Sequence, residues 1–460
     1  MTTGMRKFFT IWFGQLVSLS GTAMTRFALL IWAYQQTGKV TTLALLGFAS
    51  FILYLVFSPI AGVLVDRWDR RIVLLAADLC SGLMTASILL LYVRGDLQIW
   101  HLYVAEALTG AFNAFQIPAY YAATTVLVPK EHYSRASGMR SLAQTVSQVI
   151  APPLAGLVLV GFKLPGVLVI DLITFGIALV TLSIIRIPRP IRSHEGKQVD
   201  QVSLLSQMAF GFRYIFARTG LLCLMIFYAG INFIAALTYF GVLNAMILAR
   251  TGGNELALAS VQSALGIGGV IGGIIISVWG GPKRKIHGIL AYGAISFLLG
   301  DFMMGVGRGV LVWTGAALFS AFFIPFMISA DRAIWQQKVP ADIQGRIFGV
   351  QGFFRQMGMP LGYLLAGPLA DQYLEPAMMP GGTLAPIFGR LVGTGAGAGM
   401  GLMFVGTAIM GCTLCLSGYL IPAVRHVERD LPDAEVDPAI NVEARAASEV
   451  ALSNPSLTGT

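Results

Sequence analysis

Long apolar stretches repeat along the chain and constrain its fold more than any other feature. Each has about 20 residues or more, enough for a helix to cross the roughly 30 Å of hydrocarbon in a bilayer. Hydrophobic residues form 56% of the 460 residues and charged ones only 12%, which excludes an ordinary soluble domain. Twelve stretches are expected to span a membrane, at about 9–36, 41–65, 72–93, 98–126, 136–161, 165–187, 217–249, 256–280, 287–307, 311–337, 345–373 and 395–421.

The net charge of +9 is unevenly distributed between the segments that join these stretches. If both termini face the cytoplasm, 22 Lys and Arg residues fall on the cytoplasmic side and six on the other. This is the positive-inside pattern, which fixes the orientation of membrane proteins. The basic charge therefore reflects topology, and no nucleic-acid partner is expected. The sequence predicts a multi-pass protein of the bacterial plasma or inner membrane with cytoplasmic termini.

A polar segment divides the chain into two halves. Residues 1–187 and 217–425 are each expected to form a six-helix bundle, joined by a cytoplasmic linker at 188–216. Ser203 to Arg218, which begins in the linker and reaches the start of the second half, is a candidate amphipathic helix on the membrane surface. The acidic, aromatic-poor tail at 426–460 is expected to be disordered.

The two halves also share residues at a constant offset of 211 positions, which indicates duplication. The first-half residues are Val128, Pro129, Arg135, Gly138, Ala155 and Gly156, and their counterparts are Val339, Pro340, Arg346, Gly349, Ala366 and Gly367.

A short charged loop joins the second and third stretches and reads G-x-L-x-D-R-x-x-R-R from Gly62 to Arg71. It resembles the loop between helices 2 and 3 of the major facilitator superfamily of secondary transporters. The resemblance implies a latch that holds the two halves together on the cytoplasmic side when the transporter is open to the outside. The alternative is that its basic residues only anchor the orientation. The gating residues are expected to be Gly62, Asp66, Arg67, Arg70 and Arg71.

The resemblance covers about residues 5–425 and implies the major facilitator fold. In that fold two pseudo-symmetric six-helix bundles enclose a substrate site. The fifth stretch looks like the antiporter signature G-x8-G-x3-G-P-x2-G-G, with small residues in place of three glycines. Simple tight packing of small residues is the alternative explanation. The motif residues are Gly138, Ala151, Pro152 and Gly156.

Charged residues inside the stretches are costly in hydrocarbon and usually face a cavity or a partner. Arg26 and Glu106 are expected about 12–15 Å below the outer surface, at equal depth, where they can neutralise each other. Glu106 occupies the place where many members of the superfamily have the Arg of R-x-x-Q-G, which favours it as the proton-coupling group. A purely structural ion pair is the alternative. Asn113 follows on the same helical face, and Asn232 and Tyr239 are expected to add polar contacts to the cavity.

In the second half, Asp331 and Arg332, with Arg346 across the next loop, look like an inner gate. Arg355 is expected to meet a substrate or one of these acids, whereas Asp78, Asp171 and Asp301 favour structural hydrogen bonding.

Within the superfamily the chain resembles exporters of the macrolide-efflux type, which are similar to siderophore exporters. The stretches that carry this resemblance include Gly14 to Ser18, Phe115 to Ala119 and Trp279 to Pro282. It implies a monomeric antiporter that exchanges protons for a lipophilic drug or metabolite. A siderophore or peptide exporter, an uptake permease and a non-transporting scaffold or sensor stay open as alternatives. We expect no enzyme activity, cofactor or metal site, because the histidines form no cluster and no nucleotide-binding loop is present.

Overall fold

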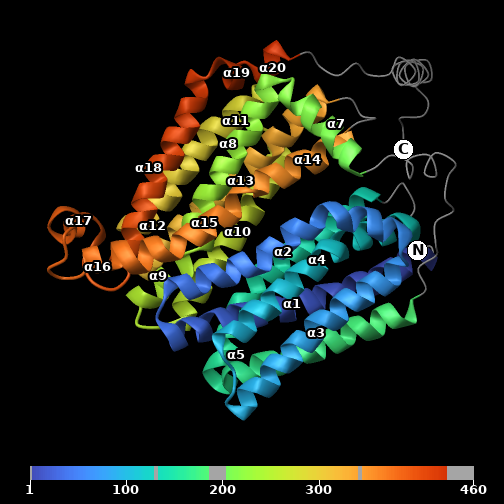
Figure 1. Ribbon diagram of the computed structural model, residues 1–460, viewed down its shortest axis with the longest axis horizontal. Helices are drawn as coiled ribbons and strands as arrows, with labels where there is room; N and C mark the ends of the chain where they lie inside the picture. Colours follow the sequence, from blue (N-terminus) through green and yellow to red (C-terminus); the bar gives the residue numbers. More distant parts are fainter. Residues whose placement is uncertain (1–2, 129–132, 186–203, 340–343, 432–460) are drawn as a thin grey trace, which may run out of the picture.

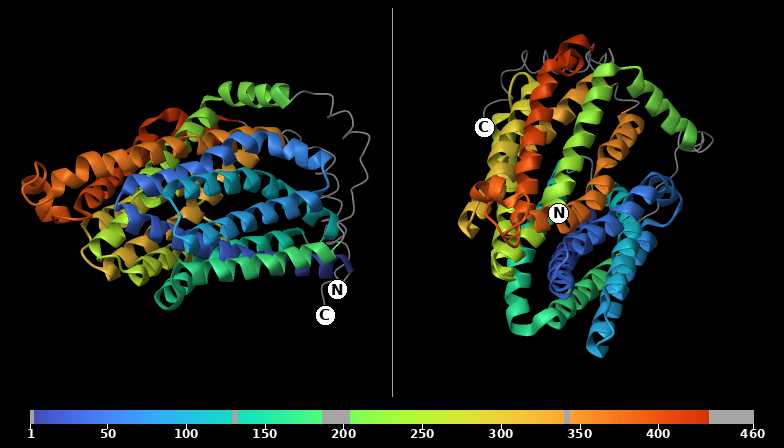
Figure 2. Two further views of the ribbon diagram at one scale, coloured as in Figure 1. Left: turned by 60° about the horizontal axis from the view of Figure 1, so that its bottom comes forward. Right: turned by 60° about the vertical axis from the view of Figure 1, so that its left-hand side comes forward.

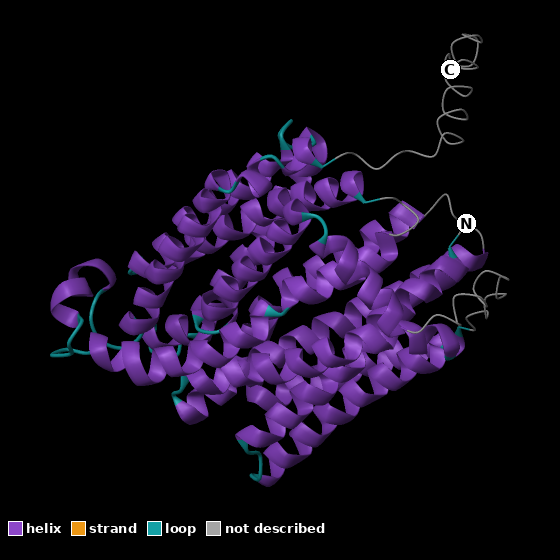
Figure 3. Ribbon diagram, turned by 45° about the horizontal axis from the view of Figure 1, so that its top comes forward, coloured by secondary structure: helices purple, strands orange, loops and turns teal. Residues whose placement is uncertain are grey.

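The computed structural model describes residues 3–128, 133–185, 204–339 and 344–431. Within these ranges the chain is helical and contains no β-strand (Figure 3). The first and second halves of the chain form two bundles (Figure 1). The first bundle contains α1 (Thr3–Thr37), α2 (Val40–Arg67), α3 (Arg70–Arg94), α4 (Ile99–Leu127) and α5 (Tyr133–Ile184).

Helix α5 contains both the fifth and the sixth predicted span. It breaks at Lys163, whose φ of 54° and ψ of −165° are not helical, and the chain turns back there (Figure 2). Within the described part of the chain, no other non-glycine residue has a positive φ. The two legs of α5 together with α1 to α4 therefore give the six predicted crossings of the first half.

The second bundle follows the linker helix α7 (Leu204–Phe216), which lies within the predicted amphipathic segment. Its six crossings are built from several helical pieces because three of them contain π-helical turns. The crossings are α8 (Thr219–Ala235) with η2 (Ala236–Phe240) and α9 (Leu243–Arg250); α10 (Glu255–Trp279); α11 (Lys285–Ser296) with η3 (Phe297–Phe302) and α12 (Met303–Val306); α13 (Val310–Lys338); α14 (Gln344–Gln356) with α15 (Gly358–Pro368), η4 (Leu369–Leu374) and α16 (Glu375–Met378); and α18 (Ala398–Leu420). The short helices α17 (Ala385–Val392), α19 (Pro422–Arg425) and α20 (Val427–Asp430) lie outside these crossings.

The two bundles are joined by one hydrophobic core at the end where α1 finishes and α2 begins, called the outer end below. This core combines Val40 and Ala155 of the first half with Leu258 and Ala366 of the second. At the opposite, inner end, each cluster of buried residues belongs to one half. One of them contains Phe8 and Val65 of the first half. The buried residues of the other two lie between positions 215 and 427. The described structure is therefore closed at the outer end.

Residues 426–431, which the sequence assigns to the tail, pack against the second bundle. Val427 is only 1% exposed. The Glu428 carboxylate accepts hydrogen bonds of 3.1 Å from the backbone N–H groups of Lys285 and Ile286 at the start of α11. The packed second half thus extends to Leu431, and the rest of the predicted tail lies outside the described residues.

Candidate functional site

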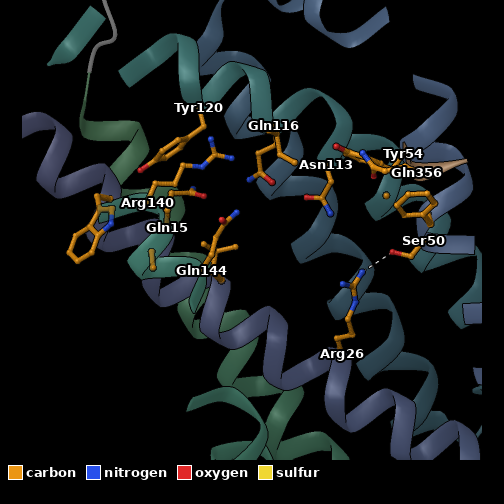
Figure 4. Close-up of a pocket in the computed structure, with 16 residues that line it drawn as sticks. Gln15, Arg26, Ser50, Tyr54, Asn113, Gln116, Tyr120, Arg140, Gln144 and Gln356 are labelled. Carbon is orange, nitrogen blue, oxygen red and sulfur yellow. Dashed lines mark hydrogen bonds between the residues drawn. The ribbon is translucent and has the colours of Figure 1, made fainter. Parts of the chain in front are cut away.

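A pocket of about 430 Å³ lies between α1, α2, α4 and α5, with one lining residue from the second half (Figure 4). Its wall is rich in polar side chains from helices far apart in the sequence. Sequence reasoning identified two of these residues as cavity residues, and missed the glutamines because an isolated Gln in an apolar stretch carries no recognisable spacing. The polar lining residues are Gln15, Arg26, Ser50, Tyr54, Asn113, Gln116, Tyr120, Arg140, Gln144 and Gln356.

Arg26 and Glu106 meet at one end of this pocket. The Arg26 guanidinium donates to the Glu106 carboxylate at 3.0 Å and to the Ser50 hydroxyl at 2.7 Å. The side chain of Arg26 is 57% exposed and that of Glu106 is 17% exposed, so Arg26 faces the open space. A close approach of α4 to α2 holds this geometry, because a Cβ at Gly110 would overlap the carbonyl oxygen of Ser50.

A buried carboxylate lies behind the middle of the pocket wall. Asp78, 4% exposed, accepts hydrogen bonds from the side-chain amides of Gln15 at 2.9 Å and Gln116 at 2.6 Å. It thereby ties α3 to α1 and α4 and fixes both glutamines. Asn113, one turn before Gln116 on α4, lines the same stretch of wall.

Two more buried acids, Asp171 and Asp301, also hydrogen-bond within their own halves, as the sequence favours. Asp171 accepts from Thr85 at 2.9 Å and from Thr22 at 3.3 Å, and Asp301 accepts from Thr407 at 3.0 Å.

Asn232 and Tyr239 do not line the pocket. Asn232 donates from its side-chain amide to the carbonyl oxygen of Arg355 at 2.9 Å, and Tyr239 packs edge-on against Phe404 at 5.4 Å between ring centroids. Residues seven apart share a face only in a regular α-helix. Tyr239 lies in the π-helical turn η2, which changes the register and directs it into the second bundle.

In the second half, Asp331 pairs with Arg355 rather than with its neighbour Arg332. The Asp331 carboxylate is fully buried, accepts from the Arg355 guanidinium at 2.6 Å and accepts from the Trp335 indole at 3.1 Å. Arg332 is exposed, and the side chain of Arg346 lies outside the described residues.

The loop between α2 and α3 is described only in part, since the side chains of Asp66 and Arg67 and the surroundings of Gly62 lie outside the described set. The Asp69 carboxylate caps α3 by accepting from the backbone N–H of Arg71 at 2.9 Å. The Arg71 guanidinium donates to the carbonyl oxygens of Leu182 and Ser183 on the second leg of α5. The loop is thus tied to its own half through Arg71, whereas Arg70 is partly exposed.

The small residues of the fifth span face the second half. Ala151 and Ala155 are fully buried, and a Cβ on Gly156 would lie 3.3 Å from Leu256 of α10. Pro152 is buried next to them, while the surroundings of Gly138 lie outside the described set. Ser263 of α10 also donates to the carbonyl oxygen of Val149 at 3.1 Å. The motif therefore lies at the contact between the halves.

Comparisons with known proteins agree with this architecture. The family model described as Major Facilitator Superfamily matches residues 11–363. Macrolide efflux protein A of Streptococcus pyogenes is 27% identical over 384 residues, which cover 80% of this chain and 90% of that protein. Multidrug efflux pump Tap of Mycolicibacterium fortuitum is 24% identical and covers 78% and 88%.

Among solved structures, a bacterial homologue of the human lysosomal transporter Spinster aligns with a TM-score of 0.66 at 15% identity. The alignment covers 92% of this chain and 98% of that one. The twelve crossings in two bundles are the fold of these transporters, so the chain is a multi-pass bacterial membrane protein. With its relatives among efflux pumps and its family match over most of its length, the chain belongs to the major facilitator superfamily of transporters.

Proposed function

We propose that this chain exports an amphipathic, largely lipophilic small molecule from the cytoplasm in exchange for protons. The efflux relatives support the direction of transport and the substrate class. The observation that carries the proton coupling is the Arg26–Glu106 ion pair, whose arginine lines the pocket. An ionisable pair within the membrane, at the edge of a cavity, is expensive unless it has a function.

The pair provides a simple exchange. When Glu106 is ionised, it neutralises Arg26; when Glu106 takes a proton, Arg26 loses its partner while its side chain stays open to the pocket. Protonation therefore changes the charge that a bound molecule meets. Substrate and proton would then occupy the site in different states, which is what antiport requires.

Alternating access is supported by where the halves touch. They share a hydrophobic core at the outer end and have separate clusters at the inner end. With the termini in the cytoplasm, the structure corresponds to the state open to the cytoplasm. We expect the loop with Asp66, Arg67, Arg70 and Arg71 to act at the inner end when the halves exchange orientation, together with the pair Asp331–Arg355.

Proteoliposomes with an imposed pH gradient test the coupling. Erythromycin, a macrolide, is the first substrate to try because of the Streptococcus pyogenes relative. Glu106→Gln is expected to abolish gradient-driven transport while elution on size exclusion stays normal, because Gln cannot exchange a proton. Asp96→Asn, in an exposed loop, removes the same charge and is expected to have no effect. Unchanged gradient-driven transport by Glu106→Gln contradicts the coupling role.

A further inference from the structure

A second arginine lies at the end of the pocket away from Arg26 (Figure 4). Arg140 belongs to the first leg of α5, one turn before Gln144, which lines the same wall. Its Nη1 atom is buried and has no hydrogen-bond partner. No ion pair involves Arg140 in the described part of the chain, in contrast to Arg26.

Aromatic side chains hold the Arg140 guanidinium in place without satisfying its N–H groups. Its central carbon lies 3.6 Å from the ring centroid of Tyr121 and 5.4 Å from that of Tyr120. Trp12, fixed by a 2.8 Å hydrogen bond from its indole N–H to the carbonyl oxygen of Met139, lines the pocket beside it. Stacking on ring faces stabilises the cation but leaves its donor edge available for an acceptor.

The charge of this pocket is therefore positive at one end and balanced at the other. Glu106 neutralises Arg26, and Asp78 is occupied by two glutamine amides. None of the described residues that line the pocket is Asp or Glu. A partly buried, uncompensated arginine is costly, and an anion that it can bind removes that cost.

We infer that Arg140 binds an anionic group, so the pocket accepts, besides lipophilic molecules without a negative charge, those that join a carboxylate to an apolar or aromatic body. The planar guanidinium matches a carboxylate in shape and can donate two parallel hydrogen bonds. Trp12, Phe51, Tyr54 and Tyr120 supply surfaces for the body. The inference rests on the proposed function, because it names the substrate class of the same pocket.

Binding of a matched pair of fluorescent probes to the purified full-length protein tests this assignment. N-dansylglycine carries a carboxylate, and N-dansylglycinamide is its neutral counterpart with the same ring system. Wild-type protein is expected to bind the acid about tenfold more tightly, as one charge-assisted contact provides. Arg140→Gln is expected to bind both probes equally, and Arg140→Lys to keep part of the preference because the charge remains. Arg284→Gln, an exposed arginine at the start of α11, is the control that keeps the full preference.

Equal binding of the two probes by the wild type, or an unchanged preference in Arg140→Gln, overturns the inference. If Arg140→Gln does not fold, a competition experiment on the wild type takes its place. Indole-3-acetate is expected to displace bound N-dansylglycine, and indole-3-acetamide is not. Equal displacement by both compounds counts against a carboxylate site. These measurements need no proton gradient. If the wild type binds both probes equally but gradient-driven transport is intact, only this inference is refuted. If the wild type prefers N-dansylglycine but shows no gradient-driven transport, the proposed export is refuted and the anion site is not.

Discussion

Asp371 of η4 forms a polar contact between the two halves at the outer end. Its carboxylate accepts from the backbone N–H groups of Val40 at 3.0 Å and Thr41 at 2.7 Å, and from the Thr41 hydroxyl at 2.6 Å. Both N–H groups belong to the first two residues of α2. The residue before them, Lys39, makes no side-chain hydrogen bond that caps the helix. A carboxylate of the second half thus caps a helix of the first half, and this contact must break whenever the outer end opens.

The size of the effect of Asp371→Asn follows from these contacts. Asn has one acceptor oxygen and no charge, so it loses at least one of the three hydrogen bonds and weakens the others. Charged hydrogen bonds contribute about 1 kcal/mol more than neutral ones. The lost charge at the N-terminus of α2 adds about 0.3–1 kcal/mol. Because water can replace part of these contacts around the partly exposed Asp371, we take a net effect of about 2 kcal/mol, which shifts the ratio of outward-open to outward-closed protein roughly 30-fold toward the open form.

Distances between spin labels measure this ratio directly. Labels at the exposed residues Arg94 and Thr383, in a protein without its four native cysteines, report the separation of the halves at the outer end. Asp371→Asn is expected to enlarge the population with the longer distance.

Glu375→Gln is the matched control for this measurement. Its carboxylate also caps a helix, by accepting from the backbone N–H groups of Gly397 at 3.0 Å and Met400 at 2.8 Å, but both lie in its own half. The Glu375→Gln variant should therefore give the same distribution of spin-label distances as the wild type. An equal distribution for Asp371→Asn as well would refute the role of this cap in closing the outer end.

Two further substitutions test the packing within each half. Gly110→Ala places a methyl group against the carbonyl oxygen of Ser50, so α4 must move away from α2 at a cost of about 1–3 kcal/mol. The melting temperature in detergent should therefore fall. Gly269→Ala is the control: its methyl group meets nothing within 4 Å, and the melting temperature should stay unchanged. Asp331→Asn leaves the partly buried Arg355 without its ion-pair partner and should cost about 3 kcal/mol. A melting temperature equal to that of the wild type would contradict this account of the pair.

The sequence predicts the number of crossings and the Arg26–Glu106 contact for a physical reason. Hydrocarbon requires long apolar helices and penalises unpaired charge, so apolar length and equal depth are both readable from residue order. Arg26 and Glu106 accordingly meet at 3.0 Å. Their role in proton coupling stays a prediction that the Glu106→Gln experiment tests.

Other features of the site depend on the folded geometry. The position of Tyr239 could not be predicted, because a π-helical turn has no clear sequence signal. Arg140 lies on the pocket wall, and the sequence carries no sign of this, because a basic residue near the end of a span equally well serves to fix the orientation. The glutamines of the pocket, such as Gln15 and Gln116, come together only because α1 and α4 pack on Asp78.

The distribution of buried carboxylates has a mechanical consequence. Asp78, Asp171 and Asp301 are buried, and each fastens helices of one bundle where separating the partners is expensive. The cap by Asp371 lies at a partly exposed rim, where water can replace it. Each bundle should therefore be stiff and the joint between them compliant, so the easiest deformation of the molecule is a tilt of one intact bundle relative to the other.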